Sequence, residues 1–227
     1  MLPMPLPSPP LRAVVFDMDG LMFNTEELYQ EVDREVLARR GKDFPDELCD
    51  QMMGRKSSEA LQVMIQWHQL EETAEQLATE IAELFEELLP GNVAPMKGLM
   101  SLVEALKTAA VPKAIATSSG RIFAGKVLSF FSLEPCFEFV LTGDDIQHGK
   151  PAPDVYQLAA KRLKVDPGEM MVLEDSQFGC QAALAAGAYT VAIPHGRSTN
   201  HHFPGVQFEA ESLADRRIYD ALRLSVG

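Results

Sequence analysis

Five short apolar runs, each of strand-like composition, recur along this chain of 227 residues. They cover residues 12–17, 113–117, 137–142, 170–174 and 189–194, and helical segments separate the later ones. Near-continuous apolar runs that alternate with helices are typical of a mostly parallel sheet covered by helices on both faces. The predicted fold class is therefore α/β, with a parallel sheet as its core.

The stretch 25–94 interrupts this alternation, because it contains no convincing strand and has helical periodicity. One of its helices carries a clear apolar stripe, formed by Leu77, Ile81, Leu84, Phe85 and Leu88. We expect a helical cap domain at 25–94, a core domain formed by 11–24 and 95–227, and a flexible Pro-rich arm at 1–10. Asn24, followed three residues later by Glu27, predicts a capping box where the first cap helix begins.

Two aspartates follow the first apolar run directly. Side chains alternate along a strand, so Asp17 and Asp19 are expected to project into the same space beyond its carboxyl end. Open α/β sheets bind their ligands there. Two carboxylates at close range favour either a divalent metal ion or a carboxylate pair with different pKa values.

Polar residues suited to chemistry follow four of the predicted strands. They are Asp17 and Asp19, Thr117-Ser118-Ser119, Lys150, and Glu174-Asp175. Together they predict phosphoryl transfer through a covalent aspartyl phosphate, in which Asp17 attacks phosphorus and Asp19 protonates the leaving alcohol, then activates water. Lys150 and the Thr117 hydroxyl are expected to hold the phosphate oxygens. The expected cofactor is Mg²⁺, bound by Asp17, Asp175 and a backbone carbonyl near Asp19.

Composition narrows the class of partner. The formal net charge is −13 and the basic residues form no long cluster, so nucleic-acid and membrane partners are not expected. A small phosphorylated metabolite is compatible with this net charge, provided that cations at the site offset the charge of its phosphate. Three widely separated cysteines favour neither a disulfide framework nor a zinc cluster, and the Pro-rich start fits a secretory signal poorly. The expected location is the cytoplasm.

The four motifs resemble those of the haloacid dehalogenase superfamily, specifically its phosphatases with a helical cap inserted after the first motif. The resemblance is carried by Phe16-Asp17-Met18-Asp19-Gly20-Leu21, Ala116-Thr117-Ser118-Ser119-Gly120, His148-Gly149-Lys150-Pro151-Ala152-Pro153-Asp154 and Leu173-Glu174-Asp175-Ser176. It implies a Rossmann-like core and repeats the roles given above. It also implies that Ser118 lies beside Thr117 at the phosphate, and that Glu174 lies beside the metal ligand Asp175.

Within the superfamily, the first motif and its continuation to Tyr29 look most similar to the pseudouridine-5′-phosphatase-like members. The related β-phosphoglucomutases carry a cap histidine near the position of Tyr29, so tyrosine favours hydrolysis. Tyr29, Arg55 and Lys56 are the cap residues expected to contact substrate. The family usually has aspartate where this chain has Asn24, and we expect hinges at residues 24–25 and 94–95.

The predicted function is thus Mg²⁺-dependent hydrolysis of a small phosphomonoester of nucleotide or sugar type. Two alternatives remain open at this point. A sugar phosphomutase similar to β-phosphoglucomutase would interconvert hexose phosphates without net release of phosphate. A receiver-like phospho-acceptor domain would be no enzyme, and it would need neither Asp19 as acid and base nor an inserted cap. No motif specifies the leaving group or the oligomeric state.

Overall fold

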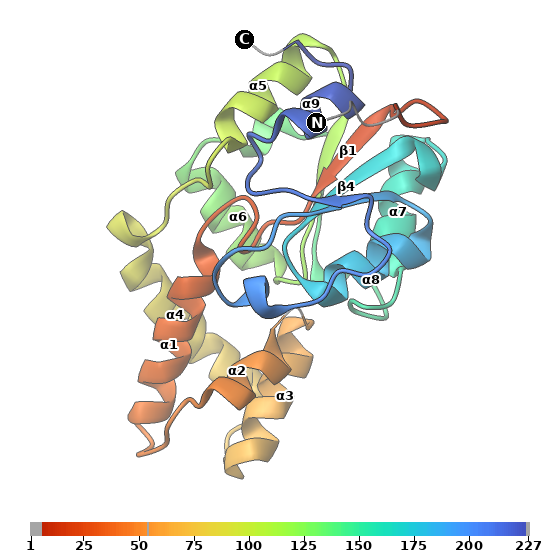
Figure 1. Cartoon of the computed structure of the whole chain (residues 1–227). Coiled ribbons are helices and arrows are strands. Elements are labelled where there is room, and N and C mark those ends of the chain that lie inside the picture. Colours follow the sequence, from red (N-terminus) through yellow and green to blue (C-terminus); the bar gives the residue numbers. More distant parts are fainter. Residues whose placement is uncertain (1–5, 54, 226–227) are drawn as a thin grey trace.

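The computed structural model describes residues 6–53 and 55–225, so the first five residues of the predicted arm at 1–10 lie outside the described part. A parallel sheet of six strands runs through the structure in the order β3-β2-β1-β4-β5-β6 (Figure 1). The strands are β1 Ala13–Phe16, β2 Lys113–Ala116, β3 Val140–Leu141, β4 Met170–Glu174, β5 Tyr189–Ala192 and β6 Phe208–Glu209. The predicted α/β class is confirmed.

Nine α-helices are assigned within the described residues. They are α1 Thr25–Ala38, α2 Asp46–Met52, α3 Ser57–His68, α4 Ala74–Asn92, α5 Leu99–Thr108, α6 Arg121–Phe130, α7 Asp154–Leu163, α8 Gln177–Ala186 and α9 Arg216–Ala221. Short 3₁₀ turns lie at Glu134–Cys136, Gly143–Asp145, Pro167–Glu169 and Gly196–Asn200. Gly187 ends α8 in the left-handed conformation, with φ of 86°.

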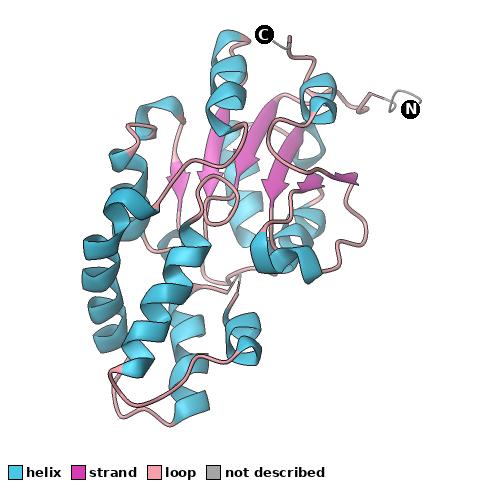
Figure 2. Ribbon diagram, turned by 60° about the vertical axis from the view of Figure 1, so that its left-hand side comes forward, coloured by secondary structure: helices cyan, strands magenta, loops and turns pink. Residues whose placement is uncertain are grey.

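The sheet lies between two layers of helices, which Figure 2 shows around the strands. Residues of β1 alternate between the layers because neighbouring side chains of a strand point to opposite faces. Val14 and Phe16 pack on the side of α5, α6 and α9, whereas Val15 packs with α7 and α8. Every residue of β1, β2 and β4 is buried, which explains why these strands read as continuous apolar runs.

Helices α1 to α4 fill the chain between β1 and α5 and extend beyond the carboxyl ends of the strands (Figure 1). A capping box between Thr73 and Gln76 begins α4, and non-helical dihedral angles at Pro90 and Gly91 break its last turn. The predicted stripe of α4 is buried at Leu77, Ile81, Leu84 and Phe85. These side chains belong to the same apolar cluster as Val14 and Phe16 of the sheet, so the two parts of the molecule share one core.

The predicted capping box at Asn24 is wrong. The Asn24 side chain makes no capping bond to α1; instead its Oδ1 accepts from the Ala94 N–H at 2.6 Å and its Nδ2 donates to the Asn92 carbonyl at 3.1 Å. Asn24 N–H also donates to the Ala94 carbonyl at 3.2 Å. Asn24 therefore ties together the two chain segments that connect α1–α4 to the rest of the molecule.

Within the described residues, no disulfide joins Cys49, Cys136 or Cys180. A search of the same residues finds no helix with the length and apolar character that a membrane span requires.

Candidate active site

The carboxyl ends of β1, β2 and β4 meet where the strand order changes direction, because β2 and β4 lie on opposite sides of β1. Asp17 directly follows β1, Thr117 directly follows β2, and Glu174 is the last residue of β4. Lys150 arrives from the loop after β3. Parallel sheets bind ligands at such a switch point. A cavity of about 1050 Å³ opens here, lined both by these strand ends and by residues of α1–α4.

Lys150 is the central cation of this site. Its Nζ lies 2.5 Å from Oδ1 of Asp17 and 2.6 Å from Oε1 of Glu174, and it also donates to the Ala116 carbonyl at 3.2 Å. The residue is only 3% exposed. Burial alone lowers the pKa of a lysine, but the charges of Asp17 and Glu174 outweigh burial and raise the pKa of Lys150 well above its usual value. Lys150 is therefore a permanent positive charge.

Glu174 holds Lys150 rather than facing the cavity. It is fully buried, and its Oε1 accepts from the Tyr156 hydroxyl at 2.8 Å as well as from Lys150. Its Oε2 accepts from both the backbone N–H and the hydroxyl of Ser176, at 3.0 and 2.9 Å. The first turn of α8 passes so close that a Cβ atom at Gly179 would lie 1.7 Å from Oε1 of Glu174. Only glycine fits at that position.

Three carboxylates form a group suited to a metal ion. One oxygen of each of Asp17, Glu174 and Asp175 lies within 4.8 Å of the others, and all three residues are buried. Burial, with the nearby charges of Glu174 and Asp19, raises the pKa of Asp17 to about 8 against the attraction of Lys150. One lysine thus does not neutralise this group. Buried carboxylate oxygens in excess of cations are the hard ligands that Mg²⁺ prefers, so the donor set fits this ion.

The Asp19 carboxylate lies outside the three-carboxylate group and is held by hydroxyl groups. Thr25 Oγ1 donates to its Oδ1 at 2.7 Å, while Thr117 Oγ1 and Ser119 Oγ lie 2.9 and 2.7 Å from its Oδ2. Burial raises the pKa of Asp19, although these hydrogen bonds oppose the shift. A hydroxyl both donates and accepts, so the same three partners suit Asp19 in its neutral and its charged form.

The other predicted ligands of the phosphate lie at the same cavity. Thr117 Oγ1 accepts from the Ser119 N–H at 3.0 Å in addition to its bond with Asp19, and Ser118 lines the cavity wall. Tyr29 lines the cavity from α1, and its hydroxyl lies 3.2 Å from Ser119 Oγ. The Tyr29 ring packs against those of Phe85 and Phe123, each at 4.9 Å between centroids.

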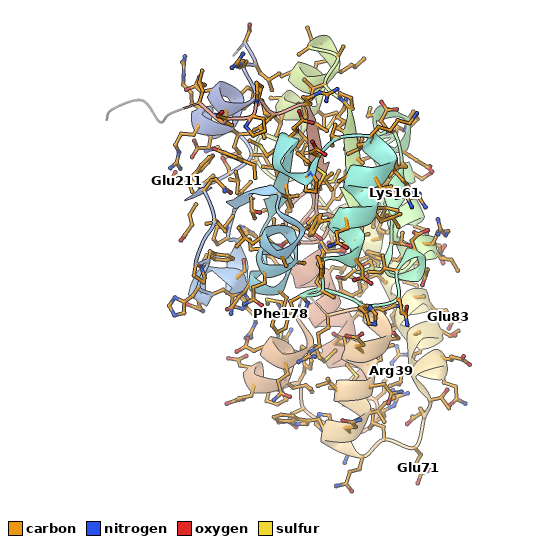
Figure 3. The ribbon with its side chains drawn as sticks, turned by 90° about the vertical axis from the view of Figure 1, so that its right-hand side faces the viewer. Arg39, Glu71, Glu83, Lys161, Phe178 and Glu211 are labelled. Carbon is orange, nitrogen blue, oxygen red and sulfur yellow. The ribbon has the colours of Figure 1, made fainter. Side chains whose placement is uncertain are left out.

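Arg55 and Lys56 separate in the structure. Arg55 lines the cavity, with its guanidinium 5.6 Å from the ring centroid of Phe178. Phe178 lies at the start of α8, at the level where the sheet and its helices meet helices α1–α4 in Figure 3. Lys56 instead donates to the Ile146 carbonyl at 3.3 Å, in the loop that leads to Lys150. Both side chains therefore connect α1–α4 to the rest of the molecule, and Arg55 alone of the two reaches the cavity.

Sequence reasoning missed several residues of this site. Thr25 and Ser119 went unassigned because a hydroxyl next to a motif has many ordinary roles. Tyr156 and Ser176 act through Glu174 and have no signature of their own. Asp33 also lines the cavity, from α1. Its signal was available, because it stands four residues after Tyr29 and three and four residues before Val36 and Leu37, on one face of that helix.

Comparison with known proteins places the chain in a family. Residues 14–193 match the family model described as haloacid dehalogenase-like hydrolase. The "Phosphorylated carbohydrates phosphatase" of Thermotoga maritima is 34% identical over 181 residues, which cover 78% of this chain and 82% of the relative. The "Probable pseudouridine-5'-phosphatase" of Drosophila melanogaster is 33% identical over 207 residues, covering 88% of this chain and 89% of that protein.

A solved structure is similar throughout. The crystal structure of CbbY from Rhodobacter sphaeroides in complex with phosphate superposes with a TM-score of 0.81 at 26% sequence identity. The alignment covers 90% of this chain and 96% of that one, so both the sheet and the inserted helices are included.

Proposed function

Because this chain belongs to the haloacid dehalogenase-like hydrolase family, we propose that it hydrolyses small phosphate monoesters through a phosphorylated Asp17. The observation that carries this proposal is the separation of two neighbouring aspartates into different surroundings. Asp17 lies with Lys150 and two further carboxylates, whereas Asp19 lies among three hydroxyl groups. Environments that differ in this way suit a nucleophile and an acid–base group.

In the first step, a carboxylate oxygen of Asp17 attacks phosphorus and the bond from phosphorus to the alcohol oxygen breaks. Asp19 enters this step as the neutral acid and gives its proton to the leaving oxygen, which its raised pKa favours. Lys150, fixed beside Asp17, offsets the negative charge of the phosphoryl oxygens. The products are the free alcohol and an acyl phosphate on Asp17.

In the second step, Asp19 is a carboxylate and takes a proton from water. That water attacks phosphorus, and the bond from phosphorus to Asp17 breaks. Inorganic phosphate leaves, Asp17 returns as a carboxylate and Asp19 returns as the acid. Thr25, Thr117 and Ser119 hold the Asp19 side chain in place through both of its protonation states.

Asp17 and Asp175 are the residues that would hold Mg²⁺ at the cavity, because Glu174 already uses both oxygens in hydrogen bonds. When bound, the ion would supply positive charge that favours the carboxylate form of Asp17, against the burial that raises its pKa, and that reduces repulsion between Asp17 and the phosphate dianion. Helices α1–α4 are proposed to act as the cap. The two chain segments that Asn24 ties together are proposed as its hinges. By analogy with the relatives, phosphorylated sugars or nucleosides are the substrate class.

The proposal is tested by phosphate release from a panel of sugar, nucleotide and glycerol phosphates with and without Mg²⁺. We expect turnover that requires the ion and stops on chelation. Asp17→Asn should be inactive while still unfolding in a single cooperative thermal transition, and exposed Asp220→Asn should behave as the parent protein. Interconversion of hexose phosphates without phosphate release would favour the mutase, and a stable phosphoprotein without turnover would favour the receiver-like domain.

A further inference from the structure

One buried acid of the cavity has no place in the chemistry above. Asp33 lies on α1, is 8% exposed and lines the same cavity as Asp17 and Asp19. It follows Tyr29 by four residues, so the two side chains share one face of α1 and Asp33 lies one turn farther from the sheet, about 6 Å along the helix axis. The Tyr29 hydroxyl marks the end of the cavity near Asp19 through Ser119. Asp33 therefore belongs to the part of the cavity away from the reacting phosphate.

The protein gives Asp33 no hydrogen-bond partner. Among the described residues, neither a hydrogen bond nor an ion pair engages its carboxylate, although nearby buried acids such as Glu174 and Asp19 have several. Burial raises the pKa of Asp33 to about 7, against the attraction of Arg34. The Asp33 oxygens open into the cavity, because in the described part of the chain the fully enclosed side-chain atoms without a partner are those of His68 and His201. A carboxylate held among apolar walls without a partner destabilises a folded protein, so packing does not explain its presence.

The surrounding walls indicate what Asp33 would bind. The helical side of the cavity is lined largely by apolar side chains, which include Phe44, Met52, Leu61, Ile81, Phe85 and Leu89. A neutral hydroxyl group enters such surroundings at a much lower desolvation cost than an ammonium group. It still supplies the donor that the carboxylate lacks.

We propose that Asp33 selects the substrate by accepting a hydrogen bond from a hydroxyl group of the leaving alcohol, remote from the ester oxygen. The proposal rests on the phosphatase function given above. It defines the substrate as a phosphate monoester whose alcohol is long enough to pass Tyr29 and carries a hydroxyl beyond it. An alcohol without this hydroxyl would leave the buried acceptor unpaired, which is the arrangement that discriminates most strongly between otherwise similar substrates.

The test uses simple n-alkyl phosphates of increasing chain length, each paired with its ω-hydroxy and ω-amino counterparts. For every length, the ratio of kcat/KM for the hydroxy ester to that for the plain ester is measured. The parent protein is expected to prefer the hydroxy ester by about tenfold or more within one range of lengths. Asp33→Leu should abolish this preference, mainly through KM, because Asp33 does not touch the reacting atoms. Asp33→Asn, which keeps an acceptor oxygen, should retain part of it.

Glu31→Gln is the matched control, since Glu31 is an exposed acid on the same helix and is not part of the cavity lining. Its ratio should equal that of the parent at every length. Thermal unfolding of Asp33→Leu and Asp33→Asn at neutral pH should occur at or above the parent temperature, which separates a role in selection from a role in folding.

Three results would overturn the inference. The first is that the parent protein prefers no hydroxy ester at any chain length. The second is that the preference for the hydroxy ester survives in Asp33→Leu. The third is that the parent protein prefers the amino ester and Asp33→Leu loses that preference. In each of these cases ester hydrolysis itself continues, so the proposed function stands. If the parent protein hydrolyses none of the esters and none of the sugar, nucleotide and glycerol phosphates, the proposed function and this inference fail together.

Discussion

The Nζ atom of Lys150 lies 2.5 Å from Oδ1 of Asp17, although 133 residues separate them in the chain. The same ammonium group contacts Glu174, so it joins the end of β1 to the end of β4. Removing it would leave three buried carboxylates, those of Asp17, Glu174 and Asp175, without their buried cation. Stability and catalysis therefore depend on the same lysine.

Lys150→Met should abolish phosphate release and lower the free energy of unfolding by about 3 kcal/mol, because breaking a buried ion pair strands the charged partner. Denaturant titration measures the loss. Lys161→Met, on the exposed side of α7 in Figure 3, should change neither quantity. Adding Glu174→Gln to Lys150→Met should recover part of the stability and none of the activity. A stable, active Lys150→Met protein would contradict the role given to this residue.

Gly179→Ala should displace Glu174, since the new Cβ atom would lie 1.7 Å from Oε1 of Glu174. We expect a fall in kcat on the order of a hundredfold and a loss of roughly 1–3 kcal/mol in stability. Gly125→Ala in α6 is the control, because its Cβ would meet nothing within 4 Å. That change should preserve activity and stabilise the helix by up to about 1 kcal/mol. Equal effects of the two substitutions would show that contact with Glu174 is unimportant.

Thr25→Val should move the pH dependence of turnover. The Thr25 hydroxyl stabilises the charged form of Asp19, so its removal raises the pKa of Asp19 further. For an aryl phosphate, whose leaving group needs no proton, Asp19 acts chiefly as the base. The ascending limb of kcat against pH should then shift to higher pH. Thr108→Val, at an exposed position, should leave the limb unchanged. A downward shift would be inconsistent with Asp19 as the base.

Asp33 should make the stability depend on pH. The folded pKa of about 7 lies above the ordinary value of 3.8, so the folded protein binds one more proton than the unfolded chain between these values. Stability relative to Asp33→Asn is therefore greatest below about pH 4 and falls as the pH rises, by roughly 4 kcal/mol once Asp33 is charged. Denaturant titrations of both proteins across this range give the difference. A difference that does not vary with pH would contradict the burial of an unpaired carboxylate.

Much of the sheet was predictable because burial on both faces requires apolar residues throughout β1, β2 and β4. Strand β6 could not be predicted, since a strand of two residues is too short to show a pattern in the sequence. The convergence of Asp17, Lys150 and Asp175 followed from topology, because the ends of parallel strands meet at one edge.

Pairings between distant segments were beyond prediction. The Asn24 side chain bonds to Ala94, whose position depends on how four helices return to the sheet. A local capping box was the better estimate from spacing alone, and it was wrong. The lack of a hydrogen-bond partner for Asp33 likewise depends on which side chains α2, α3 and α4 place opposite α1. The residues near Asp33 in the sequence do not determine this.

The buried acid on α1 has a consequence for anyone who engineers this molecule. Directed evolution toward heat tolerance, scored on survival alone, should replace Asp33 early, since almost any uncharged side chain of similar size relieves the same penalty. Libraries screened in that way would accumulate variants that are more stable but discriminate less between substrates. Selection for thermal stability and selection for substrate specificity would thus favour different residues at position 33.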